Sequence, residues 1–345
     1  MNYTLLPGTD VKISEICLGT MTFGQQNSEA DGHAQIDSAL DKGINFIDTA
    51  EMYAVPAREK TYGSTEEIIG TWLKKSGRRD EIVLATKIAG PNRGLPYIRE
   101  DLQFNDATIR LSVEKSLLRL QTDYIDLYQL HWPERNVNFF GQRGFKVKGE
   151  AWEDNIQQVL ETIQALINEG KIKHFGLSNE TPWGLMRFVE ESRKHNLPKI
   201  VTTQNPYSLL NRTFEVGLAE VCHRENVGLL AYSPLAFGVL SGKFLTGEPQ
   251  PNARITLFSN FSRYNSENTR KASALYNEIA KDNGLTLTEM ALAFIRQQQF
   301  VASTIIGATT LEQLEENINT TKVILSDEIL LEIEKVQSLI PDPAP

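Results

Sequence analysis

Two short apolar stretches, IVLATK at positions 82–87 and YIDLYQLH at positions 124–131, enclose a longer segment with a different periodicity. The middle segment, NDATIRLSVEKSLLRL at positions 105–120, repeats its apolar residues every three to four positions, as one face of a helix does. It opens on Asn105, a residue type that favours the position just before a helix. The flanking stretches are apolar over most of their length, which is typical of strands covered on both faces in a parallel sheet. This part of the chain therefore predicts a strand–helix–strand unit.

The same alternation continues along the whole chain. Repeated βα units favour a parallel sheet, and eight of them favour closure into a barrel rather than an open sheet. We therefore expect an α/β fold with a single (β/α)8 TIM barrel. The eight predicted strands are Ile16–Leu18, Asn45–Ile47, Ile82–Ala85, Tyr124–Tyr128, Ile172–Leu177, Ile200–Thr203, Gly228–Ala231 and Ser303–Ile306.

We expect residues 1–345 to form one domain, because no linker or low-complexity tract divides the chain. A Pro-Gly-Thr-Asp turn predicts an N-terminal β-hairpin within residues 1–15, and residues 326–345 are expected to form a C-terminal extra helix and tail. Two connections, 132–152 and 232–268, are unusually long. Long loops that follow barrel strands usually build the functional site, so we expect both of them beside it.

Two further helix starts are predicted from short motifs. Ser64 is followed three positions later by Glu67, and Thr286 is followed in the same way by Glu289. This is the spacing of a capping box, in which the hydroxyl and the carboxylate satisfy backbone N–H groups that the first turn leaves free. Both pairs are therefore expected to begin helices.

The composition argues against several functional classes. The chain carries 35 Lys and Arg against 44 Asp and Glu, a formal charge of −9. This net negative charge argues against extended binding to nucleic acid or to an anionic membrane. The N-terminus lacks the basic start and apolar stretch of a signal peptide. The longest apolar run, around Val227–Leu240, is interrupted by glycine, serine and proline and is too short to span a bilayer. Cys17 and Cys222 cannot build a disulfide framework. We expect a cytoplasmic protein.

Ionisable residues follow several predicted strands, at the end of a barrel where active sites lie. Asp48 follows the second strand, Lys87 the third and His131 the fourth, and Tyr53 comes five positions after Asp48. A lysine at the end of an apolar run must be paired or expelled. Each residue alone also fits a structural role, such as a charge on the rim, a helix cap or a hydrogen-bonded histidine.

Together the four residues suit the reduction of a carbonyl group. Hydride delivery to the carbonyl carbon places negative charge on the oxygen, which needs a donor aimed at it. Tyr53 can supply the proton, although an unperturbed phenol has a pKa of about 10. A Lys87 ammonium beside it would stabilise the phenolate and lower that pKa, and Asp48 would hold the ammonium in place. His131 would be a second donor to the carbonyl oxygen.

The same residues carry a family resemblance that covers about Leu6 to Leu339. The chain closely resembles the aldo/keto reductases, in particular the bacterial Tas-type branch and, more distantly, the β subunits of voltage-gated potassium channels. The motifs in this order are highly specific. The matching stretches are Cys17–Gly24, Asn45–Tyr53, Tyr128–Pro133, Gly176–Asn179, Gln204–Tyr207, Tyr232–Leu235 and Ile306–Thr309.

The resemblance implies NADPH-dependent reduction of aldehydes or ketones to alcohols, with Tyr53 as general acid and NADP(H) as cofactor. Asp48, Tyr53, Lys87 and His131 fall on the family's catalytic tetrad. Ser178, Asn179 and Gln204 fall where the nicotinamide carboxamide is bound, and Tyr232 falls where an aromatic ring stacks on the nicotinamide. Further residues expected to hold the cofactor are Gly19, Thr20, Met21, Ser233, Leu235, Gly238, Lys243, Arg254, Gly307, Thr309, Gln313, Glu316 and Asn317.

The resemblance also indicates how the phosphate end of the cofactor is bound. A guanidinium can donate two parallel hydrogen bonds to phosphate oxygens, so we assign the 2′-phosphate to Arg254. Arg263 and Arg270 are the alternative candidates. The helix beginning near Leu311 would aim N–H groups at a phosphate. Gln313 has an alternative role, because its spacing from Thr310 is also that of a helix cap.

The substrate is expected to be a small carbonyl compound in an apolar pocket. Phe23, Met52 and Trp132 are expected on its walls, with Phe258 or Phe261 as further candidates whose alternative is ordinary packing. Residues 135–149 depart from the short-loop members of the family and resemble an insertion beside the site. The sequence indicates neither a particular substrate nor a protein partner.

Other functions fit less well. A Rossmann dehydrogenase would need a Gly-x-Gly-x-x-Gly turn after an early strand, and the sequence has none. The five histidines are scattered and Pro133 separates His131 from Glu134, so no metal site is expected. A barrel isomerase or aldolase is compatible with the fold but does not account for Tyr53 with Lys87. The alternative from another class is an NADPH-sensing regulatory protein, like the channel β subunits, that binds a partner and turns over little.

Overall fold

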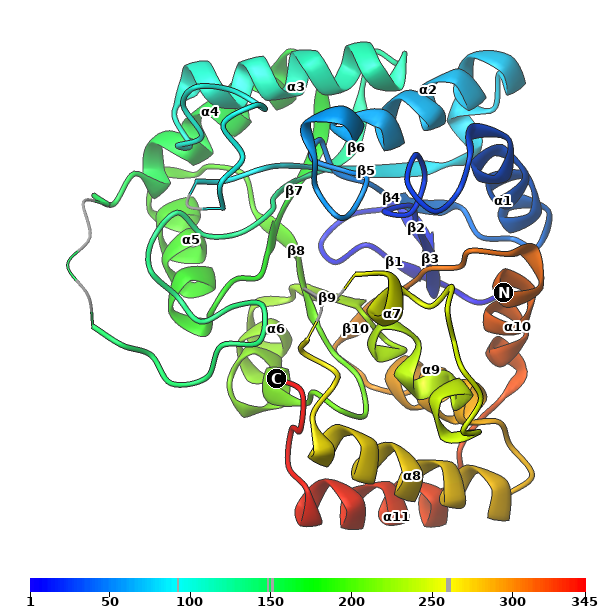
Figure 1. Cartoon of the computed structure of the whole chain (residues 1–345). Coiled ribbons are helices and arrows are strands. Elements are labelled where there is room, and N and C mark those ends of the chain that lie inside the picture. The colour runs from blue at the N-terminus through cyan, green and yellow to red at the C-terminus, as the bar shows by residue number, and fades with distance from the viewer. Residues whose placement is uncertain (92, 148, 150–151, 259–261) are drawn as a thin grey trace.

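Eight parallel strands close into a barrel at the centre of the molecule, and helices surround it (Figure 1). The computed structural model describes residues 1–345 except 92, 148, 150–151 and 259–261. Each strand pairs with the next along the chain, and β10 closes the barrel by pairing with β3. The predicted (β/α)8 barrel is confirmed. Its strands are β3 (Ile16–Gly19), β4 (Phe46–Asp48), β5 (Val83–Ile88), β6 (Ile125–Leu130), β7 (Ile172–Ser178), β8 (Ile200–Pro206), β9 (Gly228–Tyr232) and β10 (Val301–Ile306).

One layer of helices packs around the strands, and two more helices, α8 and α11, lie side by side outside that layer (Figure 1). The long connection after β9 holds the four-residue helix α7 (Arg254–Leu257) before α8 begins. The surrounding helices are α1 (Glu29–Asp41), α2 (Ser64–Ser76), α3 (Asp106–Leu120), α4 (Ile156–Asn168), α5 (Pro182–His195), α6 (Leu218–Glu225), α9 (Leu287–Arg296) and α10 (Leu311–Asn319), with α8 (Glu267–Asp282) and α11 (Asp327–Leu339) outside them.

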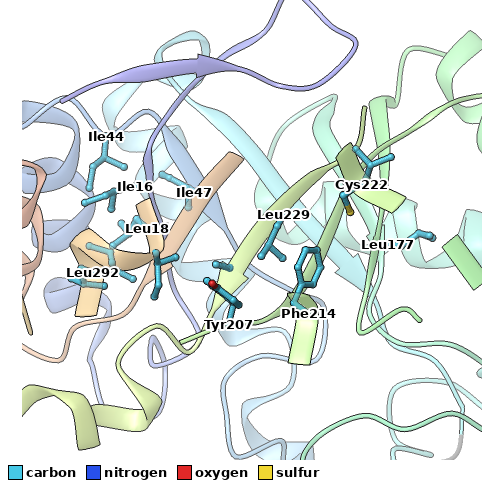
Figure 2. Packing of buried hydrophobic residues seen from close by; sticks show 14 of the residues in the cluster. Ile16, Leu18, Ile44, Ile47, Leu177, Tyr207, Phe214, Cys222, Leu229 and Leu292 are labelled. Atoms are coloured by element: carbon cyan, nitrogen blue, oxygen red, sulfur yellow. The ribbon is translucent and has the colours of Figure 1, made fainter. Parts of the chain in front are cut away.

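The near-continuous apolar runs of the strands supply two separate cores. Neighbouring residues of a strand point to opposite faces. Ile16 and Leu18 of β3 therefore face outward and pack with helix residues such as Leu292 (Figure 2). Cys17 between them faces the barrel interior. Leu229 and Leu230 of β9 divide in the same way. Both faces of each strand are thus apolar because both are covered.

An N-terminal hairpin covers the end of the barrel where the strands begin. Strands β1 (Tyr3–Leu5) and β2 (Lys12–Ser14) pair antiparallel, as the sequence predicts. Leu6 and Ile13, from the turn and the second strand, are fully buried and join the cluster inside the barrel. The hairpin therefore leaves the opposite end, where the strands finish, as the open one.

The helix starts agree with the sequence in two cases of three. Asn105 caps α3, and Thr286 forms a capping box with Glu289 at α9. The capping box expected at Ser64 is wrong: Gly63, with a positive φ of 79°, precedes α2 and Ser64 is its first helical residue. The Ser64 hydroxyl donates instead to the Thr61 carbonyl oxygen at 2.8 Å.

Among the described residues, none of the helices combines the length and the apolar character that crossing a membrane requires.

Candidate active site

A cavity of about 1550 Å³ opens at the carboxyl ends of the barrel strands. Its walls come from loops that follow β3, β4, β5, β6, β9 and β10, together with the ends of β7 and β8. Drug-sized ligands usually occupy pockets of roughly 300–1,000 Å³. This cavity is therefore large enough for a dinucleotide and a small second molecule together.

Beneath the floor of the cavity, a buried lysine lies between an aspartate and a tyrosine that line it. Lys87 is 0% exposed, and its Nζ lies 2.6 Å from Asp48 Oδ2 and donates to the Thr49 carbonyl oxygen at 2.7 Å. The same Nζ lies 4.9 Å from the centre of the Tyr53 ring. β4 and β5 pair in register, with Asp48 opposite Ala85, and this places the two charged side chains at the same barrel end. The pairing of Asp48 with Lys87 that we expected is present.

Charge and burial oppose each other at this lysine and tyrosine. Burial disfavours the Lys87 ammonium, but the attraction of Asp48 and Tyr53 outweighs it and raises the pKa of Lys87 above its usual range. Burial also raises the pKa of Tyr53, and the Lys87 charge lowers it by less, so the net shift is upward. The net lowering that we expected for Tyr53 is wrong in this structure. Tyr53 therefore keeps its proton at neutral pH and can donate it.

His131 lies beside Tyr53 and is neutral. The two rings meet edge to face with their centres 5.7 Å apart. Burial lowers the pKa of His131 well below its usual range, and the positive charges of Lys87 and Arg93 lower it further. Its Nδ1 has no hydrogen-bond partner among the described residues. A neutral imidazole keeps one N–H, so His131 can donate a hydrogen bond to an oxygen near Tyr53.

A network of amides ties this floor to the side of the cavity formed by β7, β8 and β9. Gln204 Nε2 donates to Asp48 Oδ1 at 2.8 Å, and Gln129, which the sequence did not single out, donates to the same oxygen at 3.3 Å. Asn179 donates to the His131 carbonyl oxygen at 2.9 Å and accepts from the Tyr232 hydroxyl at 2.7 Å. A molecule that contacts these amides therefore lies next to Asp48 and His131.

Every residue that the resemblance assigns to the cofactor lies on the wall of this one cavity. Two of them are cations that have no carboxylate partner among the described residues, Lys243 and Arg254. The Arg254 guanidinium lies 3.6 Å from Met21 Sδ and 5.2 Å from the Phe237 ring centre, and its Nε has no partner there. Burial lowers the pKa of Arg254 to about 10. Burial and the Arg254 charge lower the pKa of Lys243.

The two rivals of Arg254 lie in different places. Arg263 also lies on the cavity wall, whereas Arg270 lies outside it and donates to Asn265.

The capping box expected from Thr310 and Gln313 is formed only in part at the start of α10. Gln313 Oε1 accepts from the Thr309 backbone N–H at 3.0 Å, and the Thr310 hydroxyl accepts from the Gln313 N–H at 3.3 Å. Thr310 therefore caps the helix, while the Gln313 side chain holds Thr309 and lines the cavity.

The expected apolar pocket is present with one correction. Met52, Trp132 and Phe258 lie on the cavity wall. Phe23 does not lie on the wall. It is 0% exposed and packs near Gly32 and Ile68 in the core between the strands and the helices, because the turn after β3 directs its side chain there. Phe261 lies outside the described residues. The sequence missed Tyr97 and Phe140, which also line the cavity and come from the long connections after β5 and β6.

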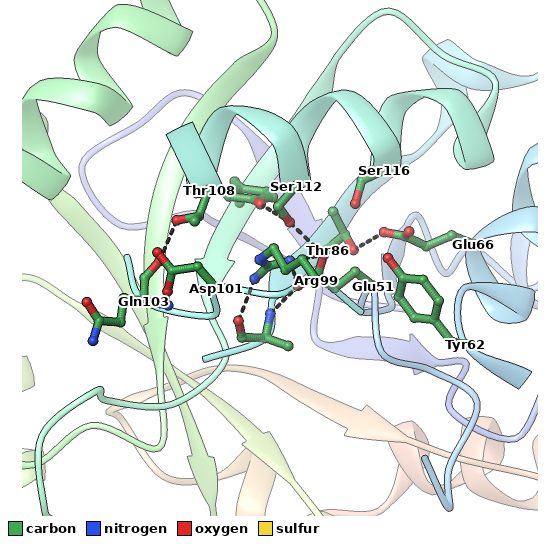
Figure 3. Close-up of polar contacts among 12 residues, drawn as sticks. Glu51, Tyr62, Glu66, Thr86, Arg99, Asp101, Gln103, Thr108, Ser112 and Ser116 are labelled. Carbon is green, nitrogen blue, oxygen red and sulfur yellow. Dashed lines mark hydrogen bonds and ion pairs between the residues drawn. The ribbon is translucent and has the colours of Figure 1, made fainter. Parts of the chain in front are cut away.

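Behind the cavity wall, Glu51 holds the loop after β5 in place (Figure 3). Glu51 is 0% exposed, accepts from the Ala89 N–H at 2.5 Å and pairs with Arg99 at 2.8 Å. Its other oxygen accepts from the Ser112 hydroxyl at 2.8 Å. Arg99 in turn donates to the Ala89 carbonyl oxygen at 2.7 Å. A carboxylate within the motif 45–53 thus positions a loop that carries cavity residues, a role that its sequence position alone does not reveal.

Replacing this carboxylate should destabilise the fold. Glu51→Gln removes the charge that balances the Arg99 guanidinium inside the protein, and breaking a buried pair on one side costs roughly 3–5 kcal/mol. We expect the free energy of unfolding in urea to fall by about 3 kcal/mol. Glu220→Gln, which breaks an exposed pair with Arg224 on α6, is the matched control and should change it by about 0.5 kcal/mol or less. A loss below about 1 kcal/mol for Glu51→Gln would contradict the anchoring role.

Comparison with known proteins gives one consistent result. The model of the aldo/keto reductase family matches residues 15–338. The chain is 51% identical to Protein tas of Escherichia coli over the full length of both chains. It is 34% identical to the uncharacterized oxidoreductase YrpG of Bacillus subtilis, over 96% of this chain and 94% of that one. It is 30% identical to norsolorinic acid reductase stcV of Emericella nidulans, over 96% of this chain and 80% of that one.

Proposed function

The chain belongs to the Tas-type branch of the aldo/keto reductase family, and on that premise we propose that it reduces aldehydes or ketones to alcohols with NADPH and with Tyr53 as proton donor. Membership of the family and the oxidoreductase relatives support carbonyl reduction in general. One observation carries the specific assignment: a fully buried Lys87, paired with Asp48 at 2.6 Å, lies below Tyr53 at the floor of a large cavity. Burying an ion pair costs free energy because both charges lose their hydration, so such pairs are frequent at functional sites. Here the pair keeps a cation beside a phenol.

The residues of the cavity suit a phosphorylated nicotinamide cofactor. Arg254 and Lys243 are two neighbouring cations without a carboxylate partner among the described residues, so an anion between them would relieve their mutual repulsion. We assign the 2′-phosphate to Arg254, the nicotinamide carboxamide to Ser178, Asn179 and Gln204, and the face of the nicotinamide ring to Tyr232. When bound, such a cofactor supplies the hydride for the carbonyl carbon.

The protein's own part is to accept the developing negative charge. Tyr53 donates its proton to the carbonyl oxygen, and the Lys87 ammonium beside it stabilises the phenolate that this leaves. His131, neutral because of its burial, donates a second hydrogen bond that positions the same oxygen. Asp48 acts through Lys87 as a positioning residue, because its contacts are with Lys87, Gln204 and Gln129.

The cofactor assignment predicts a selective loss. Arg254→Ala should raise the dissociation constant for NADPH by about thirtyfold, because a charge-assisted contact to phosphate contributes roughly 1.5–3 kcal/mol. The constant for NADH, which lacks that phosphate, should change by less than about threefold. Fluorescence titration with both cofactors measures this, with Arg270→Ala as the control because Arg270 lies outside the cavity wall. Equal losses for NADPH and NADH would show that the phosphate is bound elsewhere.

The reaction itself is tested by product analysis. Purified protein is incubated with NADPH, or with NADH in parallel, and a panel of aryl aldehydes, dicarbonyls and quinones. The proposal expects an alcohol from at least one carbonyl compound, with one equivalent of NADPH oxidised for each alcohol formed. Failure to produce an alcohol from any of them would overturn it.

A further inference from the structure

Two arginines on the cavity wall, Arg93 and Arg263, have no part in the contacts that we assign to the 2′-phosphate and the nicotinamide. Its described residues include two acids, Asp48 and Glu316, and Asp48 is already paired with Lys87. The cations on the wall are Arg58, Arg93, Lys243, Arg254 and Arg263. The cavity is therefore a local cationic region in a chain whose formal charge is −9.

Two of these cations, Arg93 and Arg263, approach adjacent residues of the long loop after β6. The exposed Arg93 guanidinium lies 4.7 Å from the ring centre of Phe140 in that loop. The half-buried Arg263 approaches the next residue, Gly141, so closely that a Cβ there would lie 3.1 Å from Arg263 Nε. Neither arginine has a carboxylate partner among the residues that the structure describes. Both therefore remain available to an anion inside the cavity.

Both arginines also face the reacting end of the cavity. The charge of Arg93 reaches His131, whose pKa it helps to lower after burial and Lys87. Arg263 lies near Tyr232, the ring that we assign to the nicotinamide, and its charge opposes the rise that burial causes in the pKa of Tyr232. Lys243 and Arg254 lie instead by Gly238 and Phe237, where we place the cofactor's phosphate. The loop that both arginines approach supplies an aromatic side chain, Phe140, which packs against Trp132.

We propose that the substrate is an aromatic carbonyl compound that carries a carboxylate, and that Arg93 and Arg263 bind this carboxylate while the carbonyl reaches Tyr53 and His131. This assignment of a substrate class rests on the proposed reductase function. A guanidinium suits the task because it offers two parallel N–H donors to a carboxylate. Phe140 and Trp132 supply the apolar surface for the ring. The long loop after β6 then has a specific role, because it brings Phe140 against Arg93 and Gly141 against Arg263.

The test compares two aldehydes that differ in charge and little in shape, 4-carboxybenzaldehyde and methyl 4-formylbenzoate. With NADPH and wild-type protein, kcat/KM for the acid should exceed that for the ester by about tenfold, the effect of one or two charge-assisted hydrogen bonds. Arg93→Met and Arg263→Met should each bring this ratio toward one, mainly by raising KM for the acid. Arg224→Met, on the exposed face of α6, is the matched control and should keep the ratio of wild type.

A dependence on salt provides a second measurement that needs no variant. KM for the acid should rise between about 0.05 and 0.5 M salt, while KM for the ester stays constant, because salt screens attraction at exposed charges. Equal kcat/KM for the two aldehydes, or a ratio that Arg93→Met leaves unchanged, would overturn the substrate class and leave the reductase function standing. No reduction of either aldehyde or of any other carbonyl compound would overturn both.

Discussion

Replacing Tyr53 by phenylalanine should lower the turnover number for carbonyl reduction by about 10³-fold. The variant keeps the ring that lies 4.9 Å from Lys87 Nζ and edge to face with His131, but it lacks the hydroxyl that donates the proton. General acid catalysis typically contributes 10²–10⁴-fold, and the burial that raises the pKa of Tyr53 keeps it in the donating form. Steady-state NADPH oxidation with a reactive aryl aldehyde measures the loss, and fluorescence titration should show nearly unchanged NADPH binding.

The matched control removes a buried hydroxyl that lies away from the cavity. Tyr128→Phe deletes a phenol that donates to Ser112 at 2.8 Å on the outer side of β6. Its turnover number should stay within about twofold of wild type, with a small loss of stability. If Tyr53→Phe retained the turnover of wild type while binding NADPH normally, another group would have to be the proton donor.

Replacing Lys87 by methionine should lower the turnover number by about 10²–10³-fold. Methionine is similar in length but brings no charge, so the phenolate that forms at Tyr53 in the transition state loses its stabilising ammonium. Stability should fall as well, because Asp48 is then a buried carboxylate without its cation. We therefore expect the variant to unfold at a lower urea concentration than wild type. It should still bind NADPH, because Lys87 is not among the residues that we assign to the cofactor.

Lys173→Met is the matched control for this second prediction. Lys173 also lies on a barrel strand and pairs with an aspartate, Asp126, at 2.9 Å, but it lies near the beginning of β7, at the opposite end of the barrel. Turnover in this variant should match wild type. A Lys87→Met protein that is folded, binds NADPH and turns over within fivefold of wild type would show that the ammonium has no part in the reaction.

Much of the fold could be predicted because its signal is local. Each strand needs an apolar run, and all eight predicted runs lie in barrel strands, with differences of a few residues at the ends. The hairpin was predictable from its turn residues. Ser64 shows the limit: its spacing from Glu67 is that of a capping box, but the positive φ of Gly63 moves the helix start by one residue. A backbone conformation set by the path of the preceding loop is not visible in a spacing rule.

The site was predictable where strand order alone brings residues together. Asp48, Lys87 and His131 follow consecutive strands, so barrel closure was enough to bring them close. Phe23 was misplaced because its direction depends on how the loop after β3 turns. Glu51 and Arg93 were not singled out, and Arg263 was considered only for the 2′-phosphate, because their contacts join connections far apart in sequence. The direction of the Tyr53 shift was also missed, since burial competes with the Lys87 charge and a sequence shows only the charge.

Counting turnovers tests the central claim most directly. Wild-type protein at a known concentration is mixed with a hundredfold excess of NADPH and of a reactive aryl aldehyde, and both the NADPH consumed and the alcohol formed are measured. If the protein is a reductase, we expect many equivalents of each per protein molecule, in a one-to-one ratio. A single stoichiometric burst, with the oxidised cofactor then held on the protein, would contradict it and would identify a cofactor sensor instead.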